Sequence, residues 1–306
     1  MNPRLSLLCV SLVLAAAAAR AHDTWFEALP GAPELALGTG TLYPQRESGI
    51  AAAYLRQQGC ITADGSLALK TLRNSDDALI VALPSGATSC WAQLSPFEIE
   101  LPADKIDLYL KEVRPPQAIV EAWSSMKARG LPWRESYVKH SRIELSAPVI
   151  AKPSPMDFDM LLTSPCPQVG QPLQIQVLRD GVPLADFAVE LRSERTRAGF
   201  WRRTDAEGRL GFQPPLPGRW IARGVDLRLS TERQDEFDSL LERQHLEVES
   251  PLGEPDAGHD GDHQRAADEH QPLVERRAAQ QEGQWQEQRD DAELAHLDAQ
   301  VETHQR

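Results

Sequence analysis

Several features that mark common protein classes are absent from this sequence of 306 residues. It has no G-x-S-x-G and no H-E-x-x-H motif, and Gly38-x-Gly40 lacks the third glycine of a nucleotide site. Ser124-x-x-Lys127 has none of the companion motifs of a serine-lysine enzyme. The 19 glycines and 23 prolines follow no period, which excludes a collagen-like chain. We therefore expect no catalytic residues and a protein that is not an enzyme.

Positive charge is also scarce. The chain has 32 basic and 45 acidic residues, a net charge of −13 and a pI of about 5.1. Such a surface repels phosphate groups, so we expect no nucleic-acid partner and no docking on anionic lipid. The 41% of apolar residues is enough for a core, whereas the mean hydropathy of −0.41 indicates that part of the chain is poorly hydrophobic.

Only one apolar run is long, and it lies at the start of the chain. Arg4 precedes an uncharged stretch from Leu5 to Ala19, about 15 residues where a membrane span needs about 20. Ala19 and Ala21 fit the small-x-small cleavage rule, so residues 1–21 are predicted to be a signal peptide cut before His22. The alternative is an uncleaved membrane anchor. The prediction is a periplasmic protein that spans no membrane after cleavage.

Export would place three cysteines in an oxidising compartment. Cys60 and Cys90 flank two runs that look like strands, so a disulfide between them is predicted, with Cys166 left buried or free. Simple burial of all three thiols is the alternative. The chain has no C-x-x-C pair, which argues against a cysteine zinc site.

Residues 22–150 are predicted to form a β domain with a helical insert over about 104–145. The continuous apolar run 79–83 has the length of a buried strand, and residues 90–94 alternate like a returning one. Three helical patterns follow. They comprise Ile106, Tyr109, Leu110 and Val113, then Ile119, Ala122, Trp123 and Met126, then Trp133, Tyr137 and Ser141.

A second β module is predicted over residues 151–250, after a proline-containing linker at 151–155. Residues 173–177 and 187–191 alternate strictly around a hairpin turn at Asp180-Gly181. Strands at this spacing are typical of a small β-sandwich. The predicted fold is therefore mainly β, with two β-sandwich-like (Ig-like) modules and a helical insert.

The last segment, 251–306, is predicted to be a disordered acidic tail. From Glu254 onwards it has 14 acidic and 5 basic residues and almost no large apolar ones. A shifted reading frame after a true terminus near Glu249 is the alternative. Its five histidines could bind divalent ions loosely, although a solvated tail is the simpler interpretation. They are His259, His263, His270, His296 and His304.

Two groups of aromatic residues could be interpreted as binding sites, but each has a simpler structural explanation. Arginines surround Phe200 and Trp201, which could suggest a strip for stacking bases. Their alternation with Glu190 and Glu194 instead predicts a solvent-facing strand. Trp123, Trp133 and Tyr137 are predicted to be helix residues that face the core. The arginines are Arg192, Arg195, Arg197, Arg202 and Arg203.

The order of several short motifs resembles one bacterial family. They are Ala21-His22-Asp23-x-Trp25-Phe26, Gly38-Thr39-Gly40-x-x-Tyr43-Pro44, Leu101–Lys105, Arg134–Tyr137 with Lys139, Asp180–Ala185 and Thr204–Gly208. Over about residues 22–249 the chain resembles a domain-of-unknown-function family often labelled the periplasmic component of a cobalt or nickel uptake system. The resemblance implies β-sandwich modules and a role near metal import with a membrane transporter as partner. It brings no catalytic residues.

His22 is the candidate metal ligand. Cleavage after Ala21 would give it a free α-amine, which together with the imidazole Nδ1 forms a chelate for a divalent transition metal, Cu, Ni or Co. Two nitrogen donors favour Cu²⁺ on intrinsic affinity. Asp23, His140 and His245 are candidates for a further donor. The alternatives are a histidine there by chance in a non-metal envelope interaction module and, more remotely, an oxidase of the copper type that begins with histidine.

Overall fold

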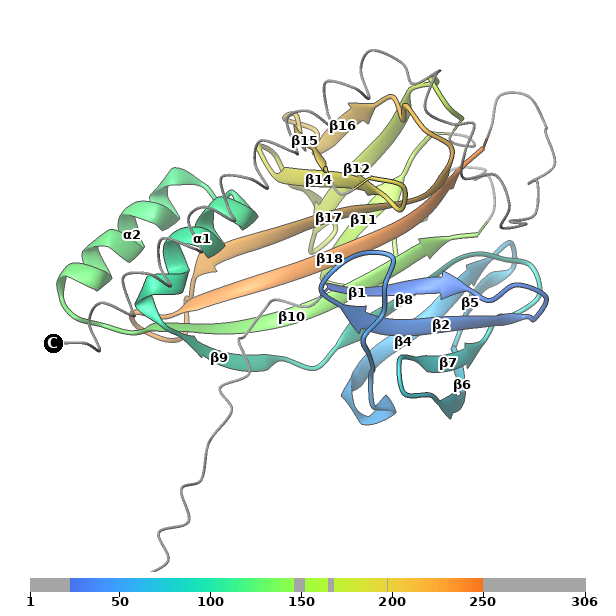
Figure 1. Cartoon of the computed structure of the whole chain (residues 1–306), viewed down its shortest axis with the longest axis horizontal. Coiled ribbons are helices and arrows are strands. Elements are labelled where there is room, and N and C mark those ends of the chain that lie inside the picture. Colours follow the sequence, from blue (N-terminus) through green and yellow to red (C-terminus); the bar gives the residue numbers. More distant parts are fainter. Residues whose placement is uncertain (1–22, 146–151, 165–167, 197, 250–306) are drawn as a thin grey trace, which may run out of the picture. The chain divides into compact units, whose positions relative to one another are not determined.

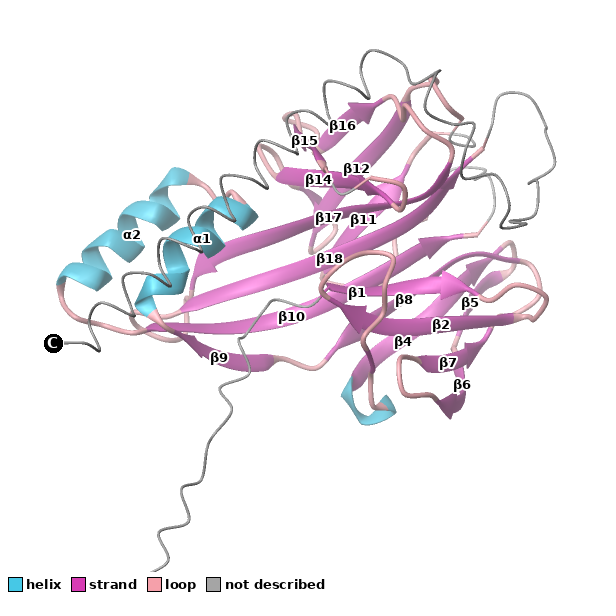
Figure 2. Cartoon of the chain, viewed as in Figure 1, coloured by secondary structure: helices cyan, strands magenta, loops and turns pink. Residues whose placement is uncertain are grey.

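The computed structural model describes residues 23–145, 152–164, 168–196 and 198–249. Within these residues the fold is mainly β, as predicted, with three sheets and two α-helices (Figures 1 and 2). The predicted signal peptide, His22, Cys166 and the predicted tail lie outside the described residues. Among the described residues, no helix is long and apolar enough to cross a membrane.

A nine-stranded sheet forms the centre of the fold. In spatial order its strands are β15 (Phe200–Arg203), β14 (Ala188–Ser193), β17 (Gly218–Leu229), β18 (Phe237–Val248), β10 (Trp133–Glu144), β8 (Ala87–Leu94), β4 (Leu55–Thr62) and β5 (Gly65–Leu67), and β9 (Phe97–Leu101) also pairs with β10.

The two predicted modules share this central sheet. Strand β10 from the first segment pairs in parallel with β18 from the second, with Glu135 opposite Phe237 and Ile143 opposite His245. The described residues all belong to one compact unit, and the central sheet contains strands from both sides of the predicted boundary at 150/151. Alternating strands predict a sandwich layer, but they do not reveal which strand pairs with which.

Two smaller sheets cover the central one. The first contains β1 (Asp23–Ala28), β2 (Glu34–Gly40), β7 (Leu79–Ala82), β6 (Lys70–Asn74) and the short β3 (Ser48–Gly49). The other contains β11 (Phe158–Leu162), β12 (Leu173–Arg179), β13 (Val182–Pro183) and β16 (Arg209–Phe212). A 3-10 turn, η1 (Ala52–Tyr54), precedes β4.

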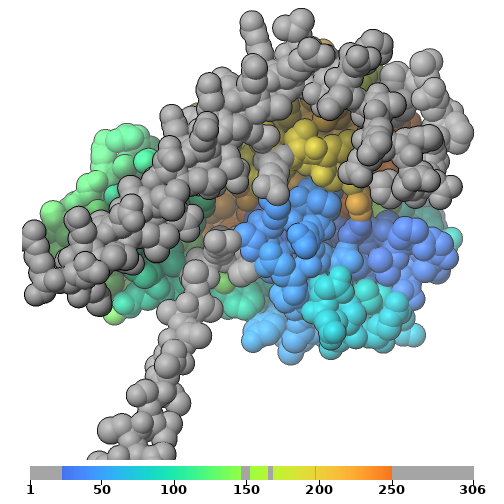
Figure 3. All heavy atoms as spheres, in the orientation of Figure 1, coloured from blue at the N-terminus to red at the C-terminus, as the bar shows by residue number. Residues whose placement is uncertain are grey.

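The two small sheets pack on opposite faces of the central sheet. Ile143 of β10 lies in the core with Phe26 and Leu35 of the first sheet. The neighbouring Arg142 instead contacts Asp159 of β11, in the other sheet. Since successive side chains in a strand point to opposite faces, β10 is buried on both. In the space-filling view, the blue and cyan residues of the N-terminal part of the described chain lie together on the lower right of the visible face (Figure 3).

The helical insert is shorter than predicted. Helices α1 (Ala103–Val113) and α2 (Gln117–Ala128) place the predicted apolar residues against the central sheet, with Trp123 packed edge-on against Trp133. The predicted third helical segment is wrong, because residues 133–144 form β10. Trp133, Tyr137 and Ser141 are spaced by four, a spacing that puts residues on one face of a helix and of a strand alike.

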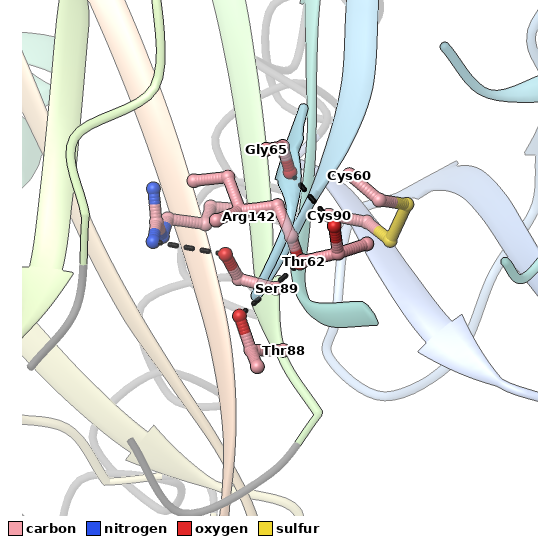
Figure 4. Close-up of a disulfide and its surroundings, with 8 residues drawn as sticks. Cys60, Thr62, Gly65, Thr88, Ser89, Cys90 and Arg142 are labelled. Carbon is pink, nitrogen blue, oxygen red and sulfur yellow. Dashed lines mark hydrogen bonds between the residues drawn. A yellow bond between two sulfur atoms is a disulfide. The ribbon is translucent and has the colours of Figure 1, made fainter. Parts of the chain in front are cut away.

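The predicted disulfide between Cys60 and Cys90 is confirmed (Figure 4). The two residues lie directly opposite each other on β4 and β8 and are fully buried. Neighbouring hydroxyls add further bonds: Thr88 Oγ1 of β8 donates to the Ile61 carbonyl of β4 at 3.1 Å, and Thr62 Oγ1 of β4 donates to the Gly65 carbonyl of β5 at 3.0 Å. The bridge therefore fastens an already paired part of the sheet.

Removing this bridge should destabilise the protein. A double substitution of Cys60 and Cys90 by alanine is expected to lower the free energy of unfolding by about 3–4 kcal/mol, because the unfolded chain regains the freedom of a long loop. Urea denaturation of both proteins measures the difference. Dithiothreitol should lower the stability of the wild type and leave the double variant unchanged, and an equal response of the two would contradict the prediction.

Candidate metal site and its surroundings

Asp23 begins β1, and the structure ties its carboxylate to two arginines of the central sheet. Arg223 Nη1 of β17 donates to Oδ2 at 2.9 Å, and Arg243 of β18 forms an ion pair with Oδ1. Only 4% of the residue is exposed. Burial alone would raise the pKa of Asp23, but the charges and hydrogen bonds of Arg243 and Arg223 outweigh burial and lower it. Both oxygens are committed to guanidinium groups, so Asp23 does not fit the predicted role of a further metal donor.

His140 also fails as a donor. Its Nδ1 lies 3.2 Å from the Leu241 carbonyl and its Nε2 lies 2.5 Å from Asp157 Oδ1. Both ring nitrogens therefore lie against oxygen atoms of the fold, and neither is left over to bind a metal. Burial raises the pKa of Asp157, but the hydrogen bond and charge of His140 outweigh it, so the net shift is downwards. His140 therefore fastens β10 to the segment that leads into β11.

Of the three candidate further donors, His245 is the one with a ring nitrogen left to bind a metal. Its Nδ1 donates to the Phe26 carbonyl at 2.7 Å, which leaves Nε2 as the basic nitrogen. Burial lowers the pKa of His245, so the ring is neutral. Its nearest ring neighbour is Tyr43, whose centroid lies 6.0 Å away. Within residues 23–145, 152–164, 168–196 and 198–249, no three His, Cys, Asp or Glu side chains come together as a metal site.

A row of charged side chains continues from Asp23 across the central sheet. Arg223 Nε also donates to Glu190 on β14, and Arg192 Nη2 donates to the same carboxylate at 3.0 Å. Lys139 on β10 lies beside Asp23 and Arg243, and burial lowers its pKa to about 8. We call Arg192, Arg223, Arg243 and Lys139 the arginine strip.

The sequence did not reveal this strip, because its members come from four strands. Arg192 was expected in a solvent-facing strand with Glu190, and this expectation is wrong, since Glu190 is buried and pairs with two arginines. The prediction is right for Arg202 and Arg203, which are exposed. The guanidinium carbon of Arg114 lies 4.2 Å from the centroid of the Trp201 ring, so this ring already has a partner within the fold.

The sequence matches no family model and no curated protein. The geometry around Asp23 and the sequence motifs are therefore the observations that bear on function.

Proposed function

We propose that this chain is an exported envelope protein that binds Cu²⁺, Ni²⁺ or Co²⁺ through the α-amine and imidazole of His22 and passes the ion to a membrane transporter. The motif order that resembles a cobalt or nickel uptake family supports the proposal. A buried disulfide between Cys60 and Cys90 suits a protein of an oxidising compartment.

One observation carries the proposal: the chain is fixed in the core from Asp23 onwards. Strand β1 pairs with β2 along its whole length, and Asp23 is held by Arg223 and Arg243. A cut after Ala21 would leave a single residue, His22, ahead of this anchor. The position of an amino-terminal chelate would then be defined by the fold.

Such a chelate would be weak and exchangeable. Asp23 and His140 are committed to other partners, so the protein would supply the two nitrogens of His22 and few further donors. Two nitrogen donors favour Cu²⁺ over Ni²⁺ and Co²⁺, whatever metal the compartment supplies. Loose binding of this kind suits a protein that hands an ion on.

Isothermal titration with Cu²⁺ and Ni²⁺ tests the chelate. Protein that begins at His22 should bind at least about tenfold more tightly than protein that retains one extra alanine before His22, because the extra residue moves the amine away from the imidazole. A His22→Ala variant should lose the same affinity. Equal affinities in all three proteins would exclude the chelate.

The second candidate is an envelope interaction module that binds a transporter or another envelope protein without metal. It is favoured by the donor geometry, because the described carboxylates and histidines near Asp23 are engaged within the fold. Capture of a transporter by His22→Ala protein in metal-free buffer would support this candidate. Loss of capture in that variant would support the metal-dependent one.

A further inference from the structure

A hollow of about 270 Å³ lies between two loops of the fold. The first loop, residues 41–45, follows β2, and the second loop, residues 194–196, follows β14. Residues 42–45 line one side of the hollow and residues 194–196 line the other. Since a water molecule takes up about 30 Å³, the hollow has room for about nine waters or for one molecule of similar size.

Two glycines allow the loops to take up this arrangement. A Cβ atom on Gly40 would collide with the Gln45 carbonyl oxygen, so a larger residue would push the first loop outwards. Gly218 has a φ of +103°, and a Cβ atom there would lie 2.5 Å from Glu194 Oε1. Residues other than glycine rarely adopt such a φ. The shape of the hollow therefore depends on the backbone at these two positions.

A row of ion pairs fixes both loops to the same part of the core. The backbone N–H of Arg219 donates to Glu194 Oε1 at 2.8 Å, and its side-chain Nε donates to Oε2 at 2.6 Å. Arg219 also pairs with Glu27, and Glu27 pairs with Arg46, which directly follows the first loop. A ligand would therefore meet a site that is already formed.

Tyr43 supplies a buried hydroxyl that lacks a partner. The residue is 5% exposed and lines the hollow, and its hydroxyl has no hydrogen bond to any described residue. Burial raises the pKa of Tyr43 above the ordinary value of 10, so the phenol stays protonated and can donate. Its ring is held edge-on against Trp25, with the centroids 5.5 Å apart. A buried donor without an acceptor is costly, so an acceptor within the hollow would be favourable.

Arg195 supplies a cation that is not committed within the fold. Burial raises the pKa of Glu194, but the hydrogen bonds and charge of Arg219, together with the charge of Arg195, outweigh it and lower the pKa. Arg195 acts there through its charge alone, because its guanidinium group forms no hydrogen bond or ion pair among the described residues. Leu42, which is 37% exposed, and Pro44 add an apolar wall beside it.

These groups define the chemistry of a ligand. A guanidinium group and a phenol O–H are both donors, and a carboxylate accepts from both. The apolar wall suits a nonpolar body on the same molecule. We propose that this hollow binds a small carboxylate that carries an apolar body of about the size of a benzene ring. The proposal does not depend on the His22 chelate, since no metal takes part in it.

Isothermal titration of the secreted, metal-free protein with benzoate tests the site. Benzamide, which has the same size and no charge, and acetate, which has no ring, are the reference ligands. Benzoate should bind saturably and at least about tenfold more tightly than either, because benzamide loses the charge-assisted hydrogen bonds and acetate loses the apolar contact. Absence of saturable benzoate binding, or equal binding of benzoate and benzamide, would overturn the proposal.

Two substitutions locate the binding. Arg195→Gln and Tyr43→Phe should each weaken benzoate binding about tenfold, as for the loss of one hydrogen bond to a charged group. Tyr43→Phe should not lower stability to urea, because the hydroxyl that it removes has no partner among the described residues. A clear loss of stability in Tyr43→Phe would show that the hydroxyl is used within the fold, and would overturn the proposal.

Arg134→Gln is the matched control for Arg195→Gln, because it removes the same charge from an exposed partner of Glu100, outside the lining of the hollow. Its affinity for benzoate should stay within about twofold of wild type. Equal weakening in Arg134→Gln and Arg195→Gln would mean a general charge effect and contradict the proposed site. His22→Ala should retain benzoate binding while it loses metal binding, which separates this proposal from the metal chelate.

Discussion

Replacing Asp23 by asparagine should destabilise the protein by about 3–5 kcal/mol, the usual effect of removing one partner from a buried ion pair. Arg243 would lose its carboxylate partner, whereas Arg223 would keep Glu190. The guanidinium group of Arg243 would then be buried without a counter-charge. Urea denaturation at neutral pH, followed by circular dichroism, measures the loss.

Acid titration gives a second measure of the Asp23→Asn effect. The folded protein lowers the pKa of Asp23 below its ordinary value of 3.8, so the stabilisation is present above that value and is lost as pH falls through the folded pKa. The difference between wild type and variant should therefore shrink in acid. Glu34→Gln, which breaks an exposed pair with Arg73, should change little at any pH, and an equal effect of both substitutions would refute the prediction.

The second large effect is expected from Arg142, whose side chain is completely buried between β10 and β11. Its guanidinium group donates to both oxygens of Asp159 at 3.2 Å, to Glu144 Oε1 at 2.8 Å and to Ser89 Oγ at 3.1 Å (Figure 4 shows the last). Arg142→Met would leave these carboxylates without a cation, and we expect a loss of about 3–5 kcal/mol. Arg142→Lys keeps the positive charge but lacks the forked guanidinium group, so its loss of stability should be intermediate.

The loss in Arg142→Met should grow with pH. Burial raises the pKa of Glu144 and of Glu242 above the ordinary value of 4.5, and Arg142 opposes the rise in both. A raised folded pKa means that stability is highest below 4.5 and falls as pH rises through the folded value. Without Arg142, the free energy of unfolding should fall more steeply as pH rises. Denaturation curves for wild type and variant at pH 5 to 8 test this, and parallel curves would contradict it.

The local elements were predictable from the sequence where a pattern has one interpretation. The alternation in residues 173–177 and the spacing of Ile106, Leu110 and Val113 gave a strand and a helix that the structure confirms. The Cys60–Cys90 pairing was predictable because both residues flank strand-like runs. Residues 133–144 were mistaken for a helix because a spacing of four residues fits the period of a helix and the period of a strand equally well.

The surroundings of Asp23 could not be predicted in the same way. Arg223, Arg243 and Glu190 are between about 170 and 220 residues from Asp23 in sequence, and only the pairing of β14, β17 and β18 brings them to one face. Histidine composition likewise suggested donors at 140 and 245. Their hydrogen bonds to Asp157 and to the Phe26 carbonyl depend on the packing of separate sheets, which no local pattern encodes.

Strand β18 lies between β10 and β17 and pairs with both along nearly its whole length, yet it is the last strand of the described chain. Until β18 (Phe237–Val248) pairs with them, β10 and β17 each have an unpaired edge. The centre of the sheet therefore cannot form before β18 is available. Pairing over such long sequence separations is slow. The core of this protein therefore forms late, once the last described strand has been synthesised.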